Sequence, residues 1–81
     1  MRFVWTIHAL ERMKQRRISR TEIEDCIKKY MAKMRDKHGN LMLICRENGY
    51  AIVIIAKDCG GDCLKIITAY RTSKLKKYTG Q

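Results

Sequence analysis

Apolar residues recur at helical spacing near the start of the chain. Thr6 is a typical N-cap residue, and it predicts a helix over about residues 7–16. His8, Arg12 and Arg16 are four residues apart and therefore share the polar side of this helix. The apolar stripe predicted for it consists of Ile7, Leu10 and Met13, with Ile18 just beyond.

A second helix is predicted over about residues 20–31. Its start is marked by a capping box, in which Ser19 precedes Glu22 by three residues. Acidic residues early in the segment and lysines late in it suit the helix dipole. The apolar face that we expect to be buried consists of Ile23, Cys26, Ile27, Tyr30 and Met31.

Beyond the second helix the helical spacing gives way to alternation and short apolar runs, which predict strands. The dipeptide Asn48-Gly49 is a strong hairpin signal, and Gly60-Gly61 marks another turn. The expected strands are a weak one over residues 31–37 and three stronger ones over 41–47, 50–57 and 63–71. In the last strand, alternation places four side chains on one face, namely Leu64, Ile66, Thr68 and Tyr70.

The order of these elements predicts an α+β fold. We expect two N-terminal helices packed on one face of a three- to four-stranded antiparallel sheet, with residues 50–57 as an interior strand. At 81 residues the chain has room for a single domain with one modest core. This domain covers residues 1–81 and ends in a basic tail over residues 72–81.

The formal net charge of +10 favours a polyanionic partner: nucleic acid, an acidic protein or an anionic membrane surface. Residues 1–20 carry six basic residues and one acidic residue, and residues 71–81 add four basic residues. The simpler interpretation is an amphipathic helix with a solvated charged side. The apolar runs are too short to span a bilayer and no signal peptide is evident, so we expect a cytoplasmic protein.

Four cysteines leave several interpretations open. Cys26 and Cys45 lie in apolar segments and are predicted to be buried thiols, as a reducing compartment would keep them. Cys59 and Cys63 flank a turn, where they remain thiols in the preferred interpretation or form a hairpin disulfide in the alternative. Together with His38 they supply three zinc ligands, whereas a structural site needs four. We therefore expect no metal and no cofactor.

The first helix and the last strand together suggest a phosphate site. If the helices cover the face of Thr68 and Tyr70, these residues approach His8 and Arg12, with Arg71 at the end of the strand. An imidazole moves protons and guanidinium groups hold phosphate, which is what metal-independent transfer of an RNA phosphodiester requires. The plainer interpretations are a structural histidine, a threonine that favours strands and a core tyrosine.

Two motifs carry a family resemblance. The opening His8-Ala9-x-x-Arg12-Met13-x-x-Arg16 and the ending Ile67-Thr68-Ala69-Tyr70-Arg71 resemble a family of small uncharacterised prokaryotic domains, grouped with RelE-like and BrnT-like toxins of toxin–antitoxin pairs. The resemblance implies a compact, RNase-type α+β fold and metal-independent mRNA cleavage that an acidic antitoxin protein restrains. That family usually has glycine after the second arginine of the opening motif, where this chain has Arg17.

We therefore expect a toxin-type endoribonuclease with RNA as its partner. His8 would be the general acid or base, Arg12 and Arg71 would hold the scissile phosphate, and Thr68 and Tyr70 would orient it. The RNA backbone would contact Arg16, Arg17, Lys74, Lys76 and Lys77. The alternatives are a non-enzymatic nucleic-acid-binding domain and an interaction module for an acidic protein. A His8 partly buried against Arg12 and the last strand favours catalysis, whereas an exposed His8 favours binding alone.

Overall fold

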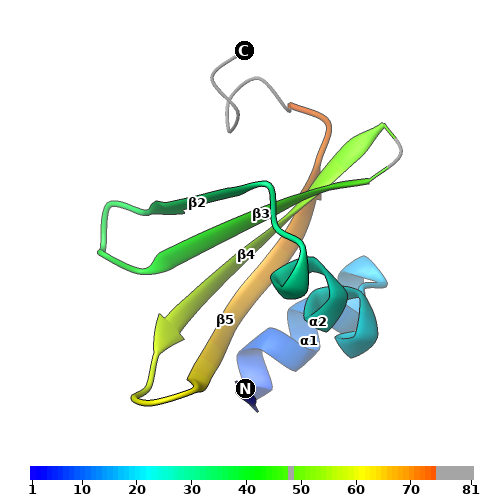
Figure 1. Ribbon diagram of the computed structural model, residues 1–81. Coiled ribbons are helices and arrows are strands. Elements are labelled where there is room, and N and C mark those ends of the chain that lie inside the picture. The colour runs from blue at the N-terminus through cyan, green and yellow to red at the C-terminus, as the bar shows by residue number, and fades with distance from the viewer. Residues whose placement is uncertain (48, 75–81) are drawn as a thin grey trace.

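The computed structural model describes residues 1–47 and 49–74, which form a layer of two helices on a sheet (Figure 1). The strands make one five-stranded sheet in the order β1-β5-β4-β3-β2. In chain order the elements are β1 (Arg2–Trp5), α1 (Ile7–Arg16), α2 (Arg20–Lys28), β2 (Ala32–Arg35), β3 (Leu41–Glu47), β4 (Tyr50–Asp58) and β5 (Cys63–Thr72). The predicted α+β class is retained.

The predicted sheet of three or four antiparallel strands is wrong. The sheet is mixed, because β1 joins its edge parallel to β5, with Arg2 opposite Cys63 and Trp5 opposite Ile66. The remaining pairs, β2 with β3, β3 with β4 and β4 with β5, are antiparallel as expected. A four-residue strand is too short to show alternation, and its partner is distant in the sequence, so local patterns do not reveal this pairing.

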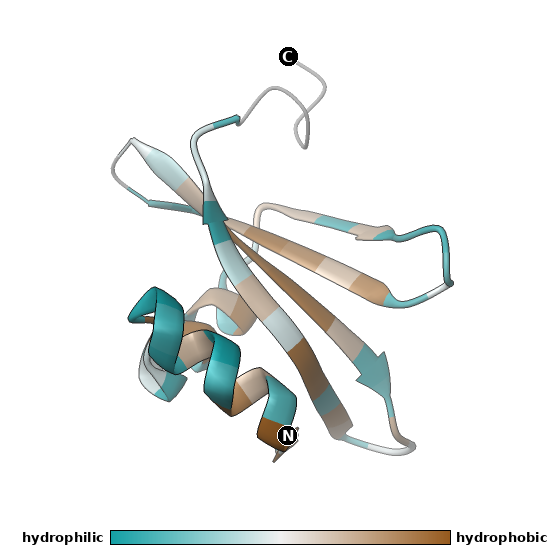
Figure 2. Ribbon diagram, turned by 180° about the vertical axis from the view of Figure 1, so that it is seen from behind, coloured by the Kyte–Doolittle hydropathy of each residue, from teal (hydrophilic) through white to brown (hydrophobic). Residues whose placement is uncertain are grey.

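The main core lies between the helices and the sheet. β4 is an interior strand, as predicted, and every residue from 51 to 56 is buried. Figure 2 shows apolar residues concentrated along the strands and hydrophilic residues over much of the helices. In α1 the buried residues are Ala9 and Met13. Ile7, two positions before Ala9, points the other way and is 77% exposed, so its predicted place in the core is wrong.

α2 is shorter than predicted. Its capping box forms: the Ser19 amide donates to the Glu22 carboxylate, and the Glu22 amide donates to the Ser19 hydroxyl. The helix nevertheless ends at Lys28, and Tyr30 and Met31 are each 44% exposed rather than buried. The Met31 amide donates to the Ile44 carbonyl at 2.9 Å, so the backbone has already entered the pairing of β2 with β3.

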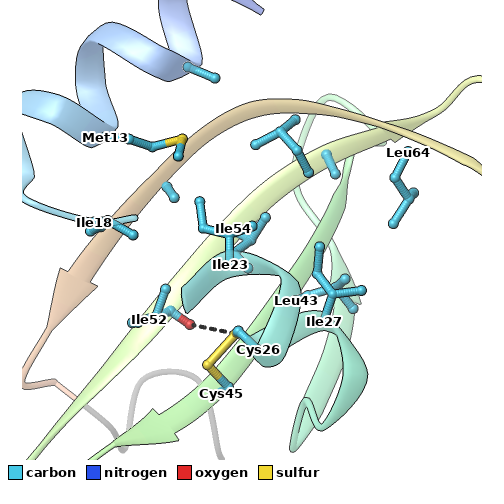
Figure 3. Close-up of a cluster of buried hydrophobic side chains, with 14 of the residues drawn as sticks. Met13, Ile18, Ile23, Cys26, Ile27, Leu43, Cys45, Ile52, Ile54 and Leu64 are labelled. Carbon is cyan, nitrogen blue, oxygen red and sulfur yellow. Dashed lines mark hydrogen bonds between the residues drawn. A yellow bond between two sulfur atoms is a disulfide. The ribbon is translucent and has the colours of Figure 1, made fainter. Parts of the chain in front are cut away.

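Both cysteine pairs form disulfides. Cys26 and Cys45 are buried as predicted, but their prediction as thiols is wrong, because a disulfide links them between α2 and β3 (Figure 3). Their Cα atoms lie 5.4 Å apart, a proximity that sequence spacing does not reveal. Cys59 and Cys63 form the hairpin disulfide that was the alternative interpretation.

The described part of the chain has neither a cluster of metal ligands nor a helix able to span a membrane. No group of three or more histidine, cysteine, aspartate or glutamate side chains within residues 1–47 and 49–74 is arranged to hold a metal ion. Over the same residues, no helix combines the length and the apolar character needed to cross a bilayer.

A β-bulge in β5 decides which side chains reach the helices. Ile55 of β4 lies opposite Thr68, but the next residue, Ala56, lies opposite Ile66, which leaves Ile67 as an extra residue. The extra residue shifts the alternation, so that Tyr70 packs on the sheet face away from the helices. The prediction that Thr68 and Tyr70 share the face of Leu64 and Ile66 is therefore wrong.

Candidate nucleic-acid interface

The N-terminal end of α1 is fixed to β5 by its capping residue. The Thr6 hydroxyl accepts from the Ala9 amide at 3.0 Å and donates to the Ile66 carbonyl at 2.9 Å. These bonds orient the first turn of α1, in which His8 is exposed. One turn later, Nε of Arg12 donates to Nε2 of His8 at 3.5 Å, at the long end of the hydrogen-bond range. The structure thus brings His8 and Arg12 together on the solvent side of the helix.

Arg16 connects the other end of α1 to β5. It lies seven residues after Ala9, at the margin of the buried stripe, so its side chain extends toward the sheet. Its Nη1 donates to the Ala69 carbonyl at 2.7 Å and lies 3.3 Å from the Thr68 hydroxyl. β1 ends opposite Ile66, so this part of β5 is beyond the last residue paired with β1. Arg16 therefore supplies the hydrogen bond that a neighbouring strand would otherwise make.

Arg71 holds the junction between α1 and α2. Its guanidinium donates to the carbonyl of Arg16 and, at 2.9 Å, to that of Arg17, which are backbone acceptors at the end of α1. It also forms an ion pair with Glu22 at 3.2 Å and lies over the Tyr50 ring at 5.7 Å. Glu22 serves the capping box of α2 at the same time, so it couples the start of α2 to the end of β5.

Arg17 ends α1 in the left-handed conformation, with φ 56° and ψ 44°. Its amide donates to the Lys14 carbonyl at 3.3 Å, and the Ile18 amide donates to the Met13 carbonyl at 2.9 Å. Glycine is the residue that usually takes this conformation at a helix end. Arg17 therefore ends the helix at the position where the resembled family usually has glycine. The left-handed backbone of a non-glycine residue costs roughly 1–2 kcal/mol.

Arg20 and Trp5 form a second contact between a guanidinium and an aromatic ring. Arg20 is the first residue of α2 and is exposed, whereas Trp5 is the last residue of β1 and is partly exposed. The guanidinium carbon lies 5.6 Å from the ring centroid. Local sequence patterns do not reveal this contact or the roles of Glu22 and Tyr50, because each joins elements that are far apart in the chain.

The predicted site residues therefore do not converge on one centre. His8 and Arg12 form one pair, and Arg16 meets Thr68 at the other end of the helix. Arg71 is engaged with backbone carbonyls and Glu22, and Tyr70 lies on the opposite sheet face. Of the predicted tail contacts, Lys74 is exposed, whereas Lys76 and Lys77 lie outside the described residues.

Comparison with known proteins places the chain in a family. A family model described as a domain of unknown function (DUF4258) matches residues 5–71, from Trp5 to Arg71. Comparison with the curated proteins gives no match, and comparison with the solved structures gives none either. The match confirms the resemblance to a family of small uncharacterised domains. The chain belongs to the DUF4258 family of domains of unknown function.

Proposed function

We propose that this domain binds RNA through a basic face made of Arg12, Arg17 and Arg20. The observation that carries the proposal is that these arginines have no acidic side chains as partners among the described residues. In the part of the chain that the structure describes, the one ion pair joins Arg71 to Glu22. All three arginines of the basic face are exposed, and none of them has an acidic partner there. Exposed, uncompensated guanidinium groups are the typical contacts of phosphates in nucleic acids.

The position of His8 favours binding over catalysis. A general base needs a fixed position beside the proton that it removes. His8 is exposed, and its hydrogen bond is to Arg12 of the same helix rather than to β5. RNA binding therefore needs nothing beyond the observed surface, whereas catalysis needs an RNA ligand that completes the site.

Metal-independent RNA cleavage is a second candidate function, supported by the pair of His8 and Arg12. Nε of Arg12 donates to Nε2 of His8, so the ring lone pair that a general base needs is occupied in this arrangement. A bound phosphate would draw Arg12 away and free this lone pair, and His8 would then take the proton of a ribose 2′-hydroxyl as its oxygen attacks phosphorus. The bond from phosphorus to the 5′-oxygen would break, the imidazolium would give its proton to that leaving oxygen, and Arg12 would stabilise the charge on the phosphate. The resemblance to RelE-like and BrnT-like toxins agrees with this activity, and an acidic antitoxin would then be the partner that covers the basic face.

The salt dependence of RNA binding tests the proposed function. Each phosphate contact with a single strand contributes a slope of about −0.7 to log affinity against log salt. Replacing Arg12, Arg17 and Arg20 together by glutamine should therefore flatten the slope by about 2. A matched triple variant, K33Q/R35Q/K57Q, removes three exposed cations on β2 and β4 and should leave the slope nearly unchanged. Equal slopes in both variants, or no RNA affinity in the wild type, would contradict the proposal.

The tail lysines are tested in the same way. If Lys74, Lys76 and Lys77 extend the basic face, their joint replacement by glutamine should flatten the slope by about 2 and weaken binding to all sequences equally. An unchanged slope would restrict the interface to the helices.

The second candidate is tested by His8→Ala. General acid–base catalysis contributes about a hundredfold or more, so the folded variant should lose cleavage by at least that factor. Cleavage by the wild type should also persist in EDTA. Intact RNA after incubation with the wild-type protein would reject cleavage and leave the binding proposal standing.

A further inference from the structure

Trp5 is a fixed ring that Arg20 covers. Trp5 packs against the core on the helix side of the sheet, and its ring centroid lies 5.9 Å from that of Phe3. Because Trp5 is partly exposed, the ring also reaches the surface, where the guanidinium of Arg20 lies over it. A guanidinium held over an indole loses little further freedom when it binds a ligand.

Arg20 differs from Arg71 in the number of guanidinium N–H donors that remain unoccupied. Both guanidinium groups lie over an aromatic ring at similar distances, 5.6 Å for Arg20 and 5.7 Å for Arg71. Arg71, however, donates to two backbone carbonyls and to Glu22. Arg20 has no hydrogen bond or ion pair to any residue in the described ranges, so its five N–H donors remain open to a ligand.

The location of Arg20 puts these donors close to Arg17, another member of the basic face. Arg20 follows Arg17 by three residues, at the junction that Arg71 ties to β5. A strand of RNA whose phosphates contact Arg17 would therefore bring a neighbouring nucleotide to Arg20. Guanidinium planes and aromatic rings are the two side-chain surfaces on which unpaired bases stack.

We propose that Arg20 and Trp5 form a nucleobase-stacking position, and that the ligand is consequently single-stranded RNA. This inference rests on the proposed function and specifies its substrate class. The faces of bases in a duplex are covered by their neighbours and cannot reach such a position, whereas the bases of a single strand can turn out and stack. Phosphate contacts alone would not make this distinction.

The fluorescence of Trp5 tests the inference directly, because it is the single tryptophan of the chain. The wild-type protein is titrated with ten-nucleotide oligouridylate, with duplex RNA of the same length and with inorganic polyphosphate. Binding is measured in parallel with labelled RNA. Oligouridylate should change the fluorescence with the same midpoint as binding, whereas bound polyphosphate should leave it unchanged. Duplex RNA should bind more weakly than the single strand.

A pair of charge-conserving variants separates stacking from charge. Arg20→Lys keeps the positive charge and removes the planar group, so affinity for oligouridylate should fall by about fivefold or more, the lower end of what base stacking contributes. Arg17→Lys makes the same exchange at a neighbouring exposed position that has no aromatic partner among the described residues, and it should preserve the preference for the single strand.

The outcomes separate the inference from the proposed function. RNA binding without a change in Trp5 fluorescence, or with equal affinity for duplex and single strand, would overturn the stacking position and leave RNA binding intact. A fluorescence change with polyphosphate would also overturn it, because phosphate alone would then account for the signal. If none of the RNAs binds, the proposed function fails and the stacking position fails with it.

Discussion

The middle and the C-terminal end of α1 involve arginines in opposite situations. In the middle of the helix, Arg12 is exposed and makes one long hydrogen bond to His8. At the C-terminal end, Arg16 donates to a β5 carbonyl, and Arg71 of β5 donates to the carbonyls that end the helix. Arg12 therefore presents its charge to solvent, whereas the guanidinium groups of Arg16 and Arg71 hold the backbone. A count of basic residues therefore does not distinguish those that hold the fold from those available to a ligand.

Replacing Arg71 should have the largest effect on stability. Arg71→Leu removes donors to two carbonyls and to Glu22, and hydrogen bonds of charged groups contribute about 1.5–3 kcal/mol when they are well shielded. Because the Arg71 side chain is 32% exposed, we expect a total loss of about 1–3 kcal/mol in the free energy of unfolding by urea. The control is Arg12→Leu, which should unfold at nearly the wild-type urea concentration. Equal losses in the two variants would show that Arg12 contributes to the stability of the fold as much as Arg71 does.

Arg17→Gly should stabilise the protein. Glycine adopts the left-handed conformation without the penalty that Arg17 incurs at φ 56°, so we expect a gain of about 1 kcal/mol, part of the penalty being offset by the greater freedom of unfolded glycine. The same variant should flatten the salt slope of RNA binding by about 0.7 if Arg17 contacts a phosphate. Thermal or urea unfolding measures the first effect. A destabilised variant would show that the Arg17 side chain itself holds the junction.

The ion pair between Glu22 and Arg71 should contribute less than the carbonyl contacts. Both side chains are about one-third exposed, at 32% and 38%, so Glu22→Gln should cost about 0.2–1 kcal/mol. Glutamine retains an oxygen that accepts from the Ser19 amide, which preserves the capping box. The difference from wild type should shrink in 1 M salt. A loss as large as that of Arg71→Leu would mean that Glu22, rather than the carbonyls, anchors Arg71.

His8→Ala should have the smallest effect on stability. His8 is exposed, and surface substitutions of this kind usually change the free energy of unfolding by no more than about 0.5 kcal/mol. Urea unfolding of His8→Ala and wild type, measured side by side, checks this expectation. A clear destabilisation would show that the pair with Arg12 holds α1, and the contrast between Arg12 and the arginines at the C-terminal end would disappear.

Local patterns predicted the local features of the fold. The capping box at Ser19, the start of α1 after Thr6 and the interior position of β4 depend on residues close together in the chain, and each is confirmed. The helix end at Arg17 is also local, because the backbone hydrogen bonds of the last turn define it.

The features that the sequence did not predict depend on distant residues or on a break in periodicity. The extra residue Ile67 reverses the alternation in β5, so a prediction based on strict alternation placed Tyr70 on the wrong face. The disulfide between Cys26 and Cys45 depends on how α2 lies on β3. In the candidate site, the proximity of His8 and Arg12 follows from helical spacing, whereas the partners of Arg71 and Arg20 come from four separate elements, α1, α2, β4 and β1.

The parallel pairing of β1 with β5 also determines when the basic face can form during synthesis. Thr6 and its acceptor Ile66 are 60 residues apart, so the N-terminal strand emerges from the ribosome long before its partner does. α1 has ten residues, too few for a stable isolated helix, and depends on β5 for its packing. The arginines of α1 therefore gain their fixed arrangement only after the last strand is made. An incomplete translation product carries these charges without the surface that arranges them.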